Sequence, residues 1–387
     1  MNFDASNSVL VVIGTRPELI KMAPIFLYLK NSSIVDPIFC STGQHKDLLV
    51  PLMDFFDINF DYDLKIMKGN QSLSHVITAT IKGVEDIIKK EKPALVLVHG
   101  DTATSFAAAT ASYMNKVPVA HVEAGLRTNN ISSPWPEEGN RQLISRLTDL
   151  NFCPTKSAQE NLLAEGISKE SIFVTGNTVI DALFLAVNKI DASSSIRTDL
   201  IDKYEFLLAY EGFILVTGHR RENFGEGIEH ICQALAQLGA CRPNLAIVYP
   251  VHPNPNIARP VREALSNFSN VFLLEPLPYS DFVFLMRSAL LILTDSGGIQ
   301  EEAPSLNTPV LIMRDTTERP EAVNAGAALL VGSSTERILN NVNTLLDDPD
   351  KLSAMSQVVN PFGDGRASER ICSEIDAFML RKLKIEH

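Results

Sequence analysis

The chain has 387 residues, 45% of them hydrophobic and 21% charged, a composition typical of a globular protein with two or three domains. Its formal net charge of -12 makes nucleic acid and anionic membranes poor partners, because their phosphates would repel it. The polar N-terminus, the lack of a long apolar run and five cysteines without CxxC spacing predict a cytoplasmic protein with reduced thiols and no metal cluster.

Short runs rich in Val, Ile and Leu recur along the chain and alternate with helix-like segments such as Thr104–Met114 and Ile228–Leu238. They are mostly apolar on both faces, as expected of parallel strands covered by helices. The first series of expected strands is Val9–Ile13, Ile38–Cys40, Ala94–Val98, Val117–His121, Leu150–Cys153 and Ile172–Val174. The second series is Phe213–Val216, Ala246–Val248, Val271–Leu274, Leu290–Leu293, Val310–Ile312 and Leu329–Val331. This alternation predicts βαβ units.

Two such series predict an α/β protein with two Rossmann-like, doubly wound domains that face each other across a cleft. We place the join after the sixth strand, near Gly176, rather than in the polar stretch 191–198. The predicted domains are therefore residues 1–175 and 176–369. In open α/β sheets ligands bind beyond the carboxyl ends of the strands, so polar residues gathered there mark the expected site.

Basic and acidic residues follow the strands of the first series. Arg16 precedes Pro17 at the expected start of a helix, where an anion is already favoured. Lys21 lies in the same helix, either as a ligand or as a surface residue. Asp101 ends an apolar strand and is either an acid of the site or the cap of the next helix, a task that Thr102 can also perform.

Two further acids come later in the first half. Glu123 directly follows a strand, and burial there disfavours its charged form unless a cation such as Arg127 or Arg141 pairs with it. Glu137 lies in an expected loop after Trp135, either as an acid of the site or as a solvated loop residue.

Imidazole groups follow strands of the second series. His219 belongs to the segment GHRREN, a cationic cluster that suits a departing diphosphate, although a single histidine is more often structural. His252 precedes Pro253 and fits a binding role or a turn equally well.

The segment LILTDSGGIQEE, residues 291–302, is typical of a buried strand, a tight glycine turn and a helix N-terminus. Such a helix end binds phosphate, and glycine lets the backbone approach it. Glu301 and Glu302 lie where an acid can accept hydrogen bonds from ribose hydroxyls. The chain has no GxGxxG after its first strand, no GxxxxGK[ST] and no GxSxG. These patterns favour a nucleotide sugar or another diphosphate as ligand, with chemistry performed by carboxylates and histidine.

Ten segments carry a family resemblance, in order from about Val9 to about Arg370: GTRPELIKMAP, TGQH, VHGDT, HVEAGLRT, SPWPEEGNR, TGNTVIDAL, VTGHRREN, YPVHPNPN, LTDSGGIQEEAPSL and MRDTTERPEAV. The chain thereby resembles the non-hydrolysing UDP-N-acetylglucosamine 2-epimerases of bacteria. The resemblance implies a GT-B type pair of domains, a helix at about 370–387 that returns to the first domain, and a homodimer that needs no cofactor, neither metal nor nicotinamide. It also implies reversible epimerisation at C-2 of UDP-N-acetylglucosamine to UDP-N-acetylmannosamine, for polysaccharide precursors, by elimination of UDP to 2-acetamidoglucal and re-addition.

The resemblance further implies roles for single residues. The catalytic set is Asp101, Glu123, Glu137 and His219, with the acid that serves each face of the sugar left open. The substrate-binding set is Arg16, Lys21, Arg141, Phe282, Ser296, Gly297, Gly298, Glu302 and Arg319, in which Phe282 stacks on uracil and Glu302 binds ribose. A second UDP-N-acetylglucosamine, bound as an activator, would contact Gln44, Asp47, Arg220 and His252. Asp47 is shorter than the Gln or Glu that relatives often carry there, and Leu277 stands where some have Gln.

Three other functions fit parts of this pattern. A GT-B glycosyltransferase shares the fold and the nucleotide site, but it needs an acceptor pocket and gives no reason for three acids around the sugar. A variant of the family could act on another 2-acetamido UDP-sugar. A nucleotide-sugar-binding regulator would not need the catalytic set.

Overall fold

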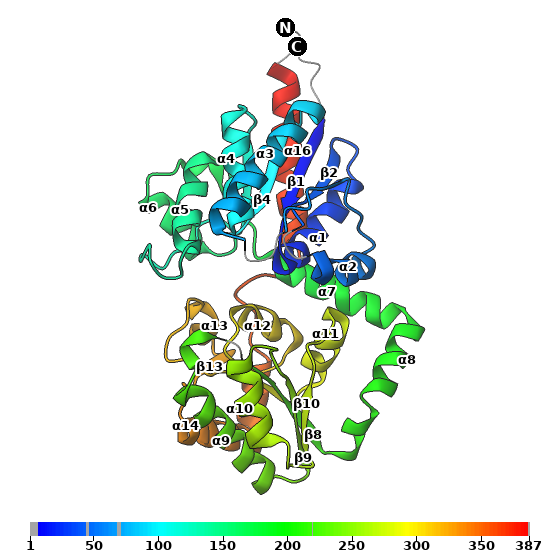
Figure 1. Ribbon diagram of the computed structural model, residues 1–387, viewed down its shortest axis with the longest axis vertical. Helices are drawn as coiled ribbons and strands as arrows, with labels where there is room; N and C mark the ends of the chain where they lie inside the picture. Colours follow the sequence, from blue (N-terminus) through cyan, green and yellow to red (C-terminus); the bar gives the residue numbers. More distant parts are fainter. Residues whose placement is uncertain (1–6, 44–45, 68–70, 219, 386–387) are drawn as a thin grey trace. The chain divides into compact units, whose positions relative to one another are not determined.

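The computed structural model of the chain describes residues 7–43, 46–67, 71–218 and 220–385. Contacts divide it into two compact units, each built on one parallel sheet (Figure 1). The first unit comprises Met1–Ala182 and Gly363–His387, and the second comprises Leu183–Phe362. Helix α7 (Thr178–Ala192) begins in the first unit and ends in the second. The predicted α/β class with two Rossmann-like sheets is confirmed.

The first unit contains, within the described residues, a seven-stranded sheet in the order β3-β2-β1-β4-β5-β6-β7, with parallel neighbours throughout. Its strands are β1 (Ser8–Ile13), β2 (Asp36–Ser41), β3 (Tyr62–Asp63), β4 (Leu95–His99), β5 (Val119–Val122), β6 (Leu150–Cys153) and β7 (Ile172–Val174). The central strands β1 and β4 are buried along their whole length, because they are apolar toward both helical layers.

The helices of the first unit are α1 (Arg16–Lys30), α2 (Lys46–Phe56), α3 (Leu73–Glu91), α4 (Ala103–Met114), α5 (Glu137–Leu147), α6 (Lys156–Ala164) and α16 (Ala367–Ile385). Helix α3 packs on α4, α4 packs on α5, and the C-terminal α16 packs on α1 (Figure 1). A core of strand residues such as Leu10 and Val96 and helix residues such as Val84 and Ala108 holds the sheet to the helices.

The second unit repeats the plan with a six-stranded parallel sheet among its described residues, in the order β10-β9-β8-β11-β12-β13. The strands are β8 (Gly212–Thr217), β9 (Leu245–Pro250), β10 (Val271–Leu274), β11 (Leu291–Thr294), β12 (Val310–Ile312) and β13 (Ala328–Leu330). The helices are α8 (Ser194–Lys203), α9 (Glu226–Cys241), α10 (Pro255–Leu265), α11 (Tyr279–Ser288), α12 (Gly297–Glu302), α13 (Pro320–Ala325), α14 (Thr335–Asp347) and α15 (Pro349–Ser356). Helix α9 packs on both α10 and α14 over this sheet.

All twelve strands expected from the sequence are present, with ends that differ by at most a few residues. The ends differ most, by two residues, at the start of β2, at the start of β5 and at the end of β9. The short strand β3 was not predicted, since two residues leave no periodic pattern to recognise.

Each sheet has a point where the strand order changes direction, between β1 and β4 in the first unit and between β8 and β11 in the second. In doubly wound sheets ligands bind beyond the carboxyl ends of the strands at such a point. The turns that follow these four strands begin at Gly14, Gly100, Gly218 and Asp295. Topology therefore directs attention to the same turns as the sequence does.

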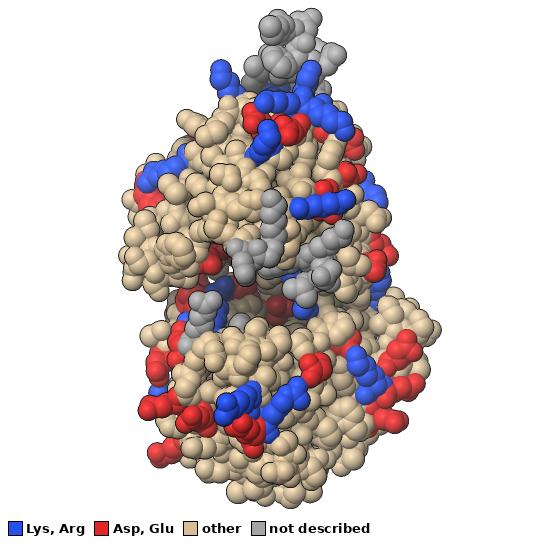
Figure 2. All heavy atoms as spheres, viewed as in Figure 1, with Lys and Arg blue, Asp and Glu red and all other residues tan. Residues whose placement is uncertain are grey.

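The surface of each unit carries interspersed acidic and basic side chains on the face that Figure 2 shows. In the described part of the chain, no helix combines the length and the apolar character that crossing a bilayer requires.

Candidate active site

The turn after β1 presents a cation at the start of helix α1. A side chain at Gly14 would clash, because its Cβ would lie 2.3 Å from Oγ1 of Thr104. The carboxylate of Glu18 accepts hydrogen bonds from the backbone N–H of Gly14 at 3.0 Å and of Thr15 at 2.7 Å. These bonds satisfy donors that the helix itself leaves without partners. The half-buried Arg16, the first residue of α1, therefore lies on a well-defined turn.

Glu123 lies just beyond β5 and binds a lysine of α1. Its carboxylate forms an ion pair with Lys21, and Asn177 donates a hydrogen bond to the same oxygen at 3.1 Å. Both charged side chains are largely buried, with exposed fractions of 12% for Lys21 and 9% for Glu123. The lysine offsets part of the hydration that this carboxylate loses on burial.

The arginines expected to pair with Glu123 bind other carboxylates. Arg127 donates from Nε to Glu165 at 2.6 Å, and Arg141 binds Asp101. The cation on Glu123 is instead Lys21, which comes from 102 residues earlier in the chain. The prediction that an arginine pairs with Glu123 was wrong. The two arginines are near Glu123 in the sequence, whereas the lysine reaches it because α1 packs beside the sheet.

Asp101 follows β4 and forms an ion pair with Arg141 of α5, whose Nε lies 3.1 Å from Oδ2 of the acid. The cap of α4 is Thr102, which accepts a hydrogen bond from the backbone N–H of Ser105 at 3.1 Å. The alternative in which Asp101 caps the helix is thereby resolved, and its carboxylate binds the arginine.

Glu137 is the first residue of α5, so it begins a helix rather than lying in the expected loop. The next residue, Glu138, is fully buried and accepts hydrogen bonds from Arg141 at 3.1 Å and from the backbone N–H of Thr128 at 3.0 Å. Although burial raises it, hydrogen bonds from Gln142 and Thr128 and the charge of Arg141 together lower the pKa of Glu138. Arg141 is thus held between two carboxylates.

The two ion pairs lie at the ends of adjacent strands. Strands β4 and β5 pair up to His99 and Val122, immediately before the turns that carry Asp101 and Glu123. Gly100 begins the turn after β4 with a φ of 64°, and a Cβ there would lie 3.7 Å from a carboxylate oxygen of Glu123. The first unit therefore brings together the pairs Lys21–Glu123 and Arg141–Asp101.

Two histidines lie beneath these acids and are almost completely buried. Burial lowers the pKa of His99 to about 3, although the nearby Glu123 opposes this shift. Burial likewise lowers the pKa of His121 to about 4. Nε2 of His121 lies 2.7 Å from the carbonyl oxygen of Gly100, which can only accept, so this nitrogen carries the hydrogen. Both rings are neutral at physiological pH.

In the second unit, a buried acid joins the two turns at the point where the strand order changes. Asp295 follows β11 and accepts hydrogen bonds from the backbone N–H of Arg220 at 2.9 Å and from the side chain of Asn223 at 3.1 Å. Behind them the hydroxyls of Thr217 and Thr294 lie 2.6 Å apart. The turn after β8 is thus tied to the turn after β11.

The glycine turn forms as predicted, with Ser296 as the cap and Gly297 and Gly298 as the first residues of α12. A Cβ on Gly297 would lie 2.7 Å from the guanidinium carbon of Arg319, so glycine is needed for this close approach. Nε of Arg319 donates to the buried Glu301 at 2.7 Å. Arg319 therefore lies against the turn to which it was assigned.

The remaining predicted residues of the second unit lie on several different elements. Glu302 ends α12 and accepts a hydrogen bond from Tyr279 at 3.3 Å, while the half-buried Phe282 lies on α11. Arg220 lies 3.4 Å from Glu318, an acid that also binds Arg319. The exposed His252 follows β9. Gln44 and His219 lie outside the described residues, and for Asp47 only the backbone of α2 is described.

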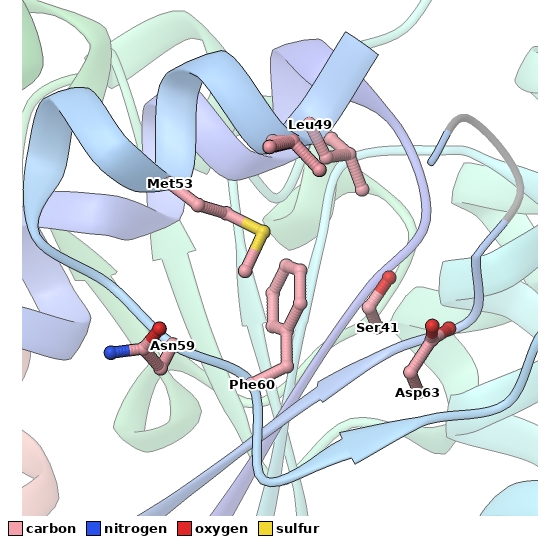
Figure 3. A pocket seen from close by; sticks show the side chains of 7 residues that line it. Ser41, Leu49, Met53, Asn59, Phe60 and Asp63 are labelled. Atoms are coloured by element: carbon pink, nitrogen blue, oxygen red, sulfur yellow. The ribbon is translucent and has the colours of Figure 1, made fainter. Parts of the chain in front are cut away.

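A cavity of about 230 Å³ lies in the first unit between α2 and the strands β2 and β3 (Figure 3). Ser41, Met53, Phe60 and Asp63 are among the side chains that surround it. None of its described lining residues belongs to the predicted catalytic set. Among the residues that the structure describes, no group of three or more His, Cys, Asp or Glu side chains could hold a metal ion.

Several residues of these clusters were missed by sequence reasoning. The segment from Thr15 to Glu18 has the Thr-x-x-Glu spacing of a capping box, so a signal for Glu18 was available. Glu138 stands beside a predicted acid, yet its burial could not be foreseen. Asn177 and His99 carry no local pattern that connects them with Glu123.

Comparison with known proteins gives consistent matches over nearly the whole chain. The family model described as UDP-N-acetylglucosamine 2-epimerase matches residues 28–376. A UDP-N-acetylglucosamine 2-epimerase of Campylobacter jejuni is 50% identical over 366 residues, which cover 94% of this chain and 96% of that protein. The enzyme of the same name from Salmonella typhimurium is 49% identical over 370 residues, covering 96% of this chain and 98% of that protein.

Solved structures agree with the sequence matches. The UDP-GlcNAc 2-epimerase of Neisseria meningitidis, bound to UDP-GlcNAc, is similar with a TM-score of 0.90 and 47% identity, covering 95% of this chain and 99% of that one. The Methanocaldococcus jannaschii enzyme, in complex with UDP-GlcNAc and UDP, has a TM-score of 0.80 and 32% identity over 95% of this chain and 99% of that one. A glycosyltransferase of Rickettsia africae, at 17% identity and a TM-score of 0.64, shares the fold alone.

Proposed function

The chain belongs to the UDP-N-acetylglucosamine 2-epimerases, and we propose that it inverts C-2 of UDP-N-acetylglucosamine by eliminating and re-adding UDP. The hydrogen at C-2 is not acidic, because no carbonyl group activates it directly. A base can remove it while the C-1–oxygen bond breaks and UDP departs with the bonding electrons. A double bond forms between C-1 and C-2, which gives 2-acetamidoglucal. UDP then adds back to C-1 while an acid protonates C-2 from the opposite face.

The observation that carries this proposal is the pair of ion-paired acids at the ends of β4 and β5, Asp101 with Arg141 and Glu123 with Lys21. Exchange of a proton between two faces of a ring requires two proton carriers, and general acid–base catalysis requires them to be positioned before the reaction. The two acids follow neighbouring strands of one sheet, because β4 pairs with β5 up to His99 and Val122. Glu137 is the third candidate, at the start of α5.

We assign the nucleotide to the second unit. The turn Ser296–Gly298 and Arg319 offer backbone N–H groups and a guanidinium to the diphosphate, as helix N-termini and arginines do at anion sites. Phe282 would stack on uracil, Glu302 would bind ribose, and His219 would neutralise the departing diphosphate. Arg16 would also contact phosphate. The relatives whose structures hold UDP-GlcNAc and UDP support this choice of ligand.

The rival functions receive less support. The similar glycosyltransferase shares only the fold at 17% identity, whereas the epimerases match over nearly the whole chain. A non-catalytic regulator gives no reason for two ion-paired acids side by side. An activator site at Gln44, Asp47, Arg220 and His252, a cytoplasmic homodimer and a role in polysaccharide synthesis follow from the family resemblance and belong to this proposal.

The first test is the replacement Asp101→Asn, which removes a proton carrier and keeps the shape of the side chain. Wild-type protein in deuterated water should place deuterium at C-2 of UDP-N-acetylglucosamine and give a new manno signal in proton NMR. In the variant this exchange should slow by about 10²- to 10⁴-fold, the usual contribution of a general acid or base, while UDP affinity changes little.

The control is Asp202→Asn, the same substitution at an exposed acid of α8, which should exchange at the wild-type rate. Normal turnover by Asp101→Asn would remove this acid from the mechanism. Unchanged substrate with the wild-type protein would refute the elimination itself.

A further inference from the structure

Glu18 is a buried carboxylate that connects two turns of the first unit. Its side chain is 1% exposed, and it lies in the first turn of α1. One oxygen, Oε2, accepts the backbone N–H groups of Gly14 and Thr15 at 3.0 and 2.7 Å. The other, Oε1, lies 2.7 Å from the hydroxyl of Thr102 and 2.9 Å from that of Ser105, at the start of α4. A single side chain thus binds the turn before Arg16 and the turn after Asp101.

Capping of α1 accounts for only half of these contacts. An ordinary capping glutamate reaches back to the backbone at the start of its own helix, as Oε2 does here. Oε1 instead binds residues 84 and 87 positions further along the chain. Thr102 directly follows Asp101, and its hydroxyl also caps α4. Displacement of Glu18 would therefore release the turn of Asp101 as well as the turn of Arg16.

The hydroxyl of Ser105 extends this connection to the end of β4. Its oxygen lies 2.5 Å from the carbonyl oxygen of His99 and 2.9 Å from Oε1 of Glu18. Because a hydroxyl carries one hydrogen, Ser105 can donate to only one of these oxygens at a time. The side chains of Glu18, Thr102 and Ser105 nevertheless all contact one another, and each of them is buried or half-buried.

We propose that Glu18 is a positioning residue for the epimerisation. It holds the turn of Arg16 in a fixed position relative to the turn of Asp101, so that Arg16 can contact phosphate while Asp101 is placed to transfer a proton. This inference rests on the proposed roles of Arg16 and Asp101. A small displacement of a group that contacts a reacting atom can lower the reaction rate by a large factor. A residue that does not touch the substrate can therefore still control turnover.

The variant Glu18→Gln keeps the contacts with the turn of Arg16 and changes those with the turn of Asp101. One amide oxygen can still accept the backbone N–H groups of Gly14 and Thr15, so the start of α1 is preserved. The amide NH₂ takes the place of Oε1 and presents hydrogens to the Thr102 hydroxyl, which loses its acceptor. We expect kcat to fall about 10- to 100-fold, with a much smaller change in KM and in UDP affinity.

A matched pair of serines in α4 distinguishes positioning from general loss of stability. Ser105 and Ser112 are both fully buried, but among the described residues the hydroxyl of Ser112 binds within its own helix, to the carbonyl oxygen of Ala108 at 2.7 Å. Ser105→Ala should lower kcat. Ser112→Ala should keep the wild-type kcat, even if the two substitutions lower the unfolding free energy by the same amount. Thr102→Ser, which keeps the hydroxyl, should retain activity, and Thr102→Val should lose it.

These variants decide the inference even if Glu18→Gln fails to fold. Wild-type kcat in Ser105→Ala and Thr102→Val, or an equal loss in Ser112→Ala, would overturn it. Additive effects in the double variant Glu18→Gln/Thr102→Val would also count against it, since residues that act through one contact give non-additive losses. The exchange assay of Asp101→Asn tests the underlying function separately, so the two failures remain distinguishable.

Discussion

At the scale of single residues, Glu123 is held in a conformation that its own backbone disfavours. Its φ of 64° costs roughly 1–3 kcal/mol for a residue with a Cβ. The surrounding contacts compensate, because Lys21 and Asn177 both bind its carboxylate. Strain of this kind is common where a side chain must be aimed at a ligand. The positive φ turns Glu123 off the line of β5, and this supports its place among the proton carriers.

The buried histidines give the protein a pH dependence of stability that can be measured. The pKa of His99 is about 3 and that of His121 about 4 in the folded protein, because burial disfavours the imidazolium. In the unfolded chain both titrate near 6.5. The unfolded state therefore binds more protons below this pH, and stability is lost as the pH falls.

We expect each of these histidines to remove about 1 kcal/mol of unfolding free energy between pH 7 and pH 5.5. Urea titrations at both pH values measure the difference. Over this range, the unfolding free energy of His99→Asn should fall by about 1 kcal/mol less than that of the wild type. An identical pH dependence in the variant and the wild type would mean that His99 has the same pKa in the folded protein as in the unfolded chain.

The candidate residues themselves were largely accessible from the sequence, but their partners were not. Arg16, Asp101 and Ser296 follow strands or begin helices, and a strand end followed by a polar residue can be recognised locally. The ion pair of Lys21 with Glu123 spans 102 residues, and that of Arg141 with Asp101 spans 40. Such partners are chosen by packing, which no local pattern contains.

At the scale of elements, an acid of the distant helix α7 binds the first residues of α16, the C-terminal helix. The backbone N–H groups of Ala367 and Ser368, the first residues of α16, donate to Asp181 of α7 at 3.2 and 2.7 Å. Further along, Ser32 donates to Asp376 of the same helix at 3.1 Å. Two of the N-terminal donors of α16 are thus satisfied by a tertiary contact.

We expect Asp181→Asn to lower the unfolding free energy by about 1–2 kcal/mol, because one backbone N–H of α16 would then face an amide N–H. Urea unfolding followed by circular dichroism measures this effect. The exposed Asp202 of α8 provides the matched control, and Asp202→Asn should unfold like the wild type. Equal stability of both variants would show that α16 does not depend on this acid.

Most elements follow from local sequence, and the exceptions have physical causes. The apolar strands are recognisable because residues buried on both faces form continuous runs of Val, Ile and Leu. Helix α5 starts earlier than expected, at Glu137, because the segment SSPWPEEGNR reads as a loop from its prolines. The proline at 136 stands directly before the helix, where it removes no helical hydrogen bond.

At the scale of the whole molecule, two sheets of the same design carry different chemistry. The first unit has acids and cations beyond the ends of β1, β4 and β5, and the second has a glycine turn beside Arg319. We expect UDP alone to slow hydrogen exchange of backbone amides in residues 296–302, because binding stabilises the folded state of the segment it contacts. UDP-N-acetylglucosamine should in addition slow exchange in residues 101–105 and 123–128.

Mass spectrometry of peptides from the exchanged protein measures both effects. Helix α6 contains none of the predicted site residues, so its amides should exchange at the same rate with either ligand. Equal protection of residues 101–105 by UDP and by the complete nucleotide sugar would contradict the assignment of the sugar to the acids of the first unit.

The sequence by itself determined the two doubly wound sheets, the positions of twelve strands, the glycine turn and the family, because each is recorded in neighbouring residues or in ordered segments. Only the tertiary structure decided that Lys21 is the cation on Glu123, that Arg141 serves Asp101, and that Glu18 ties two turns together. The physical reason is distance along the chain. A strand or a turn depends on nearby residues, whereas burial and ion pairing depend on side chains that meet only after the helices have packed on the sheet.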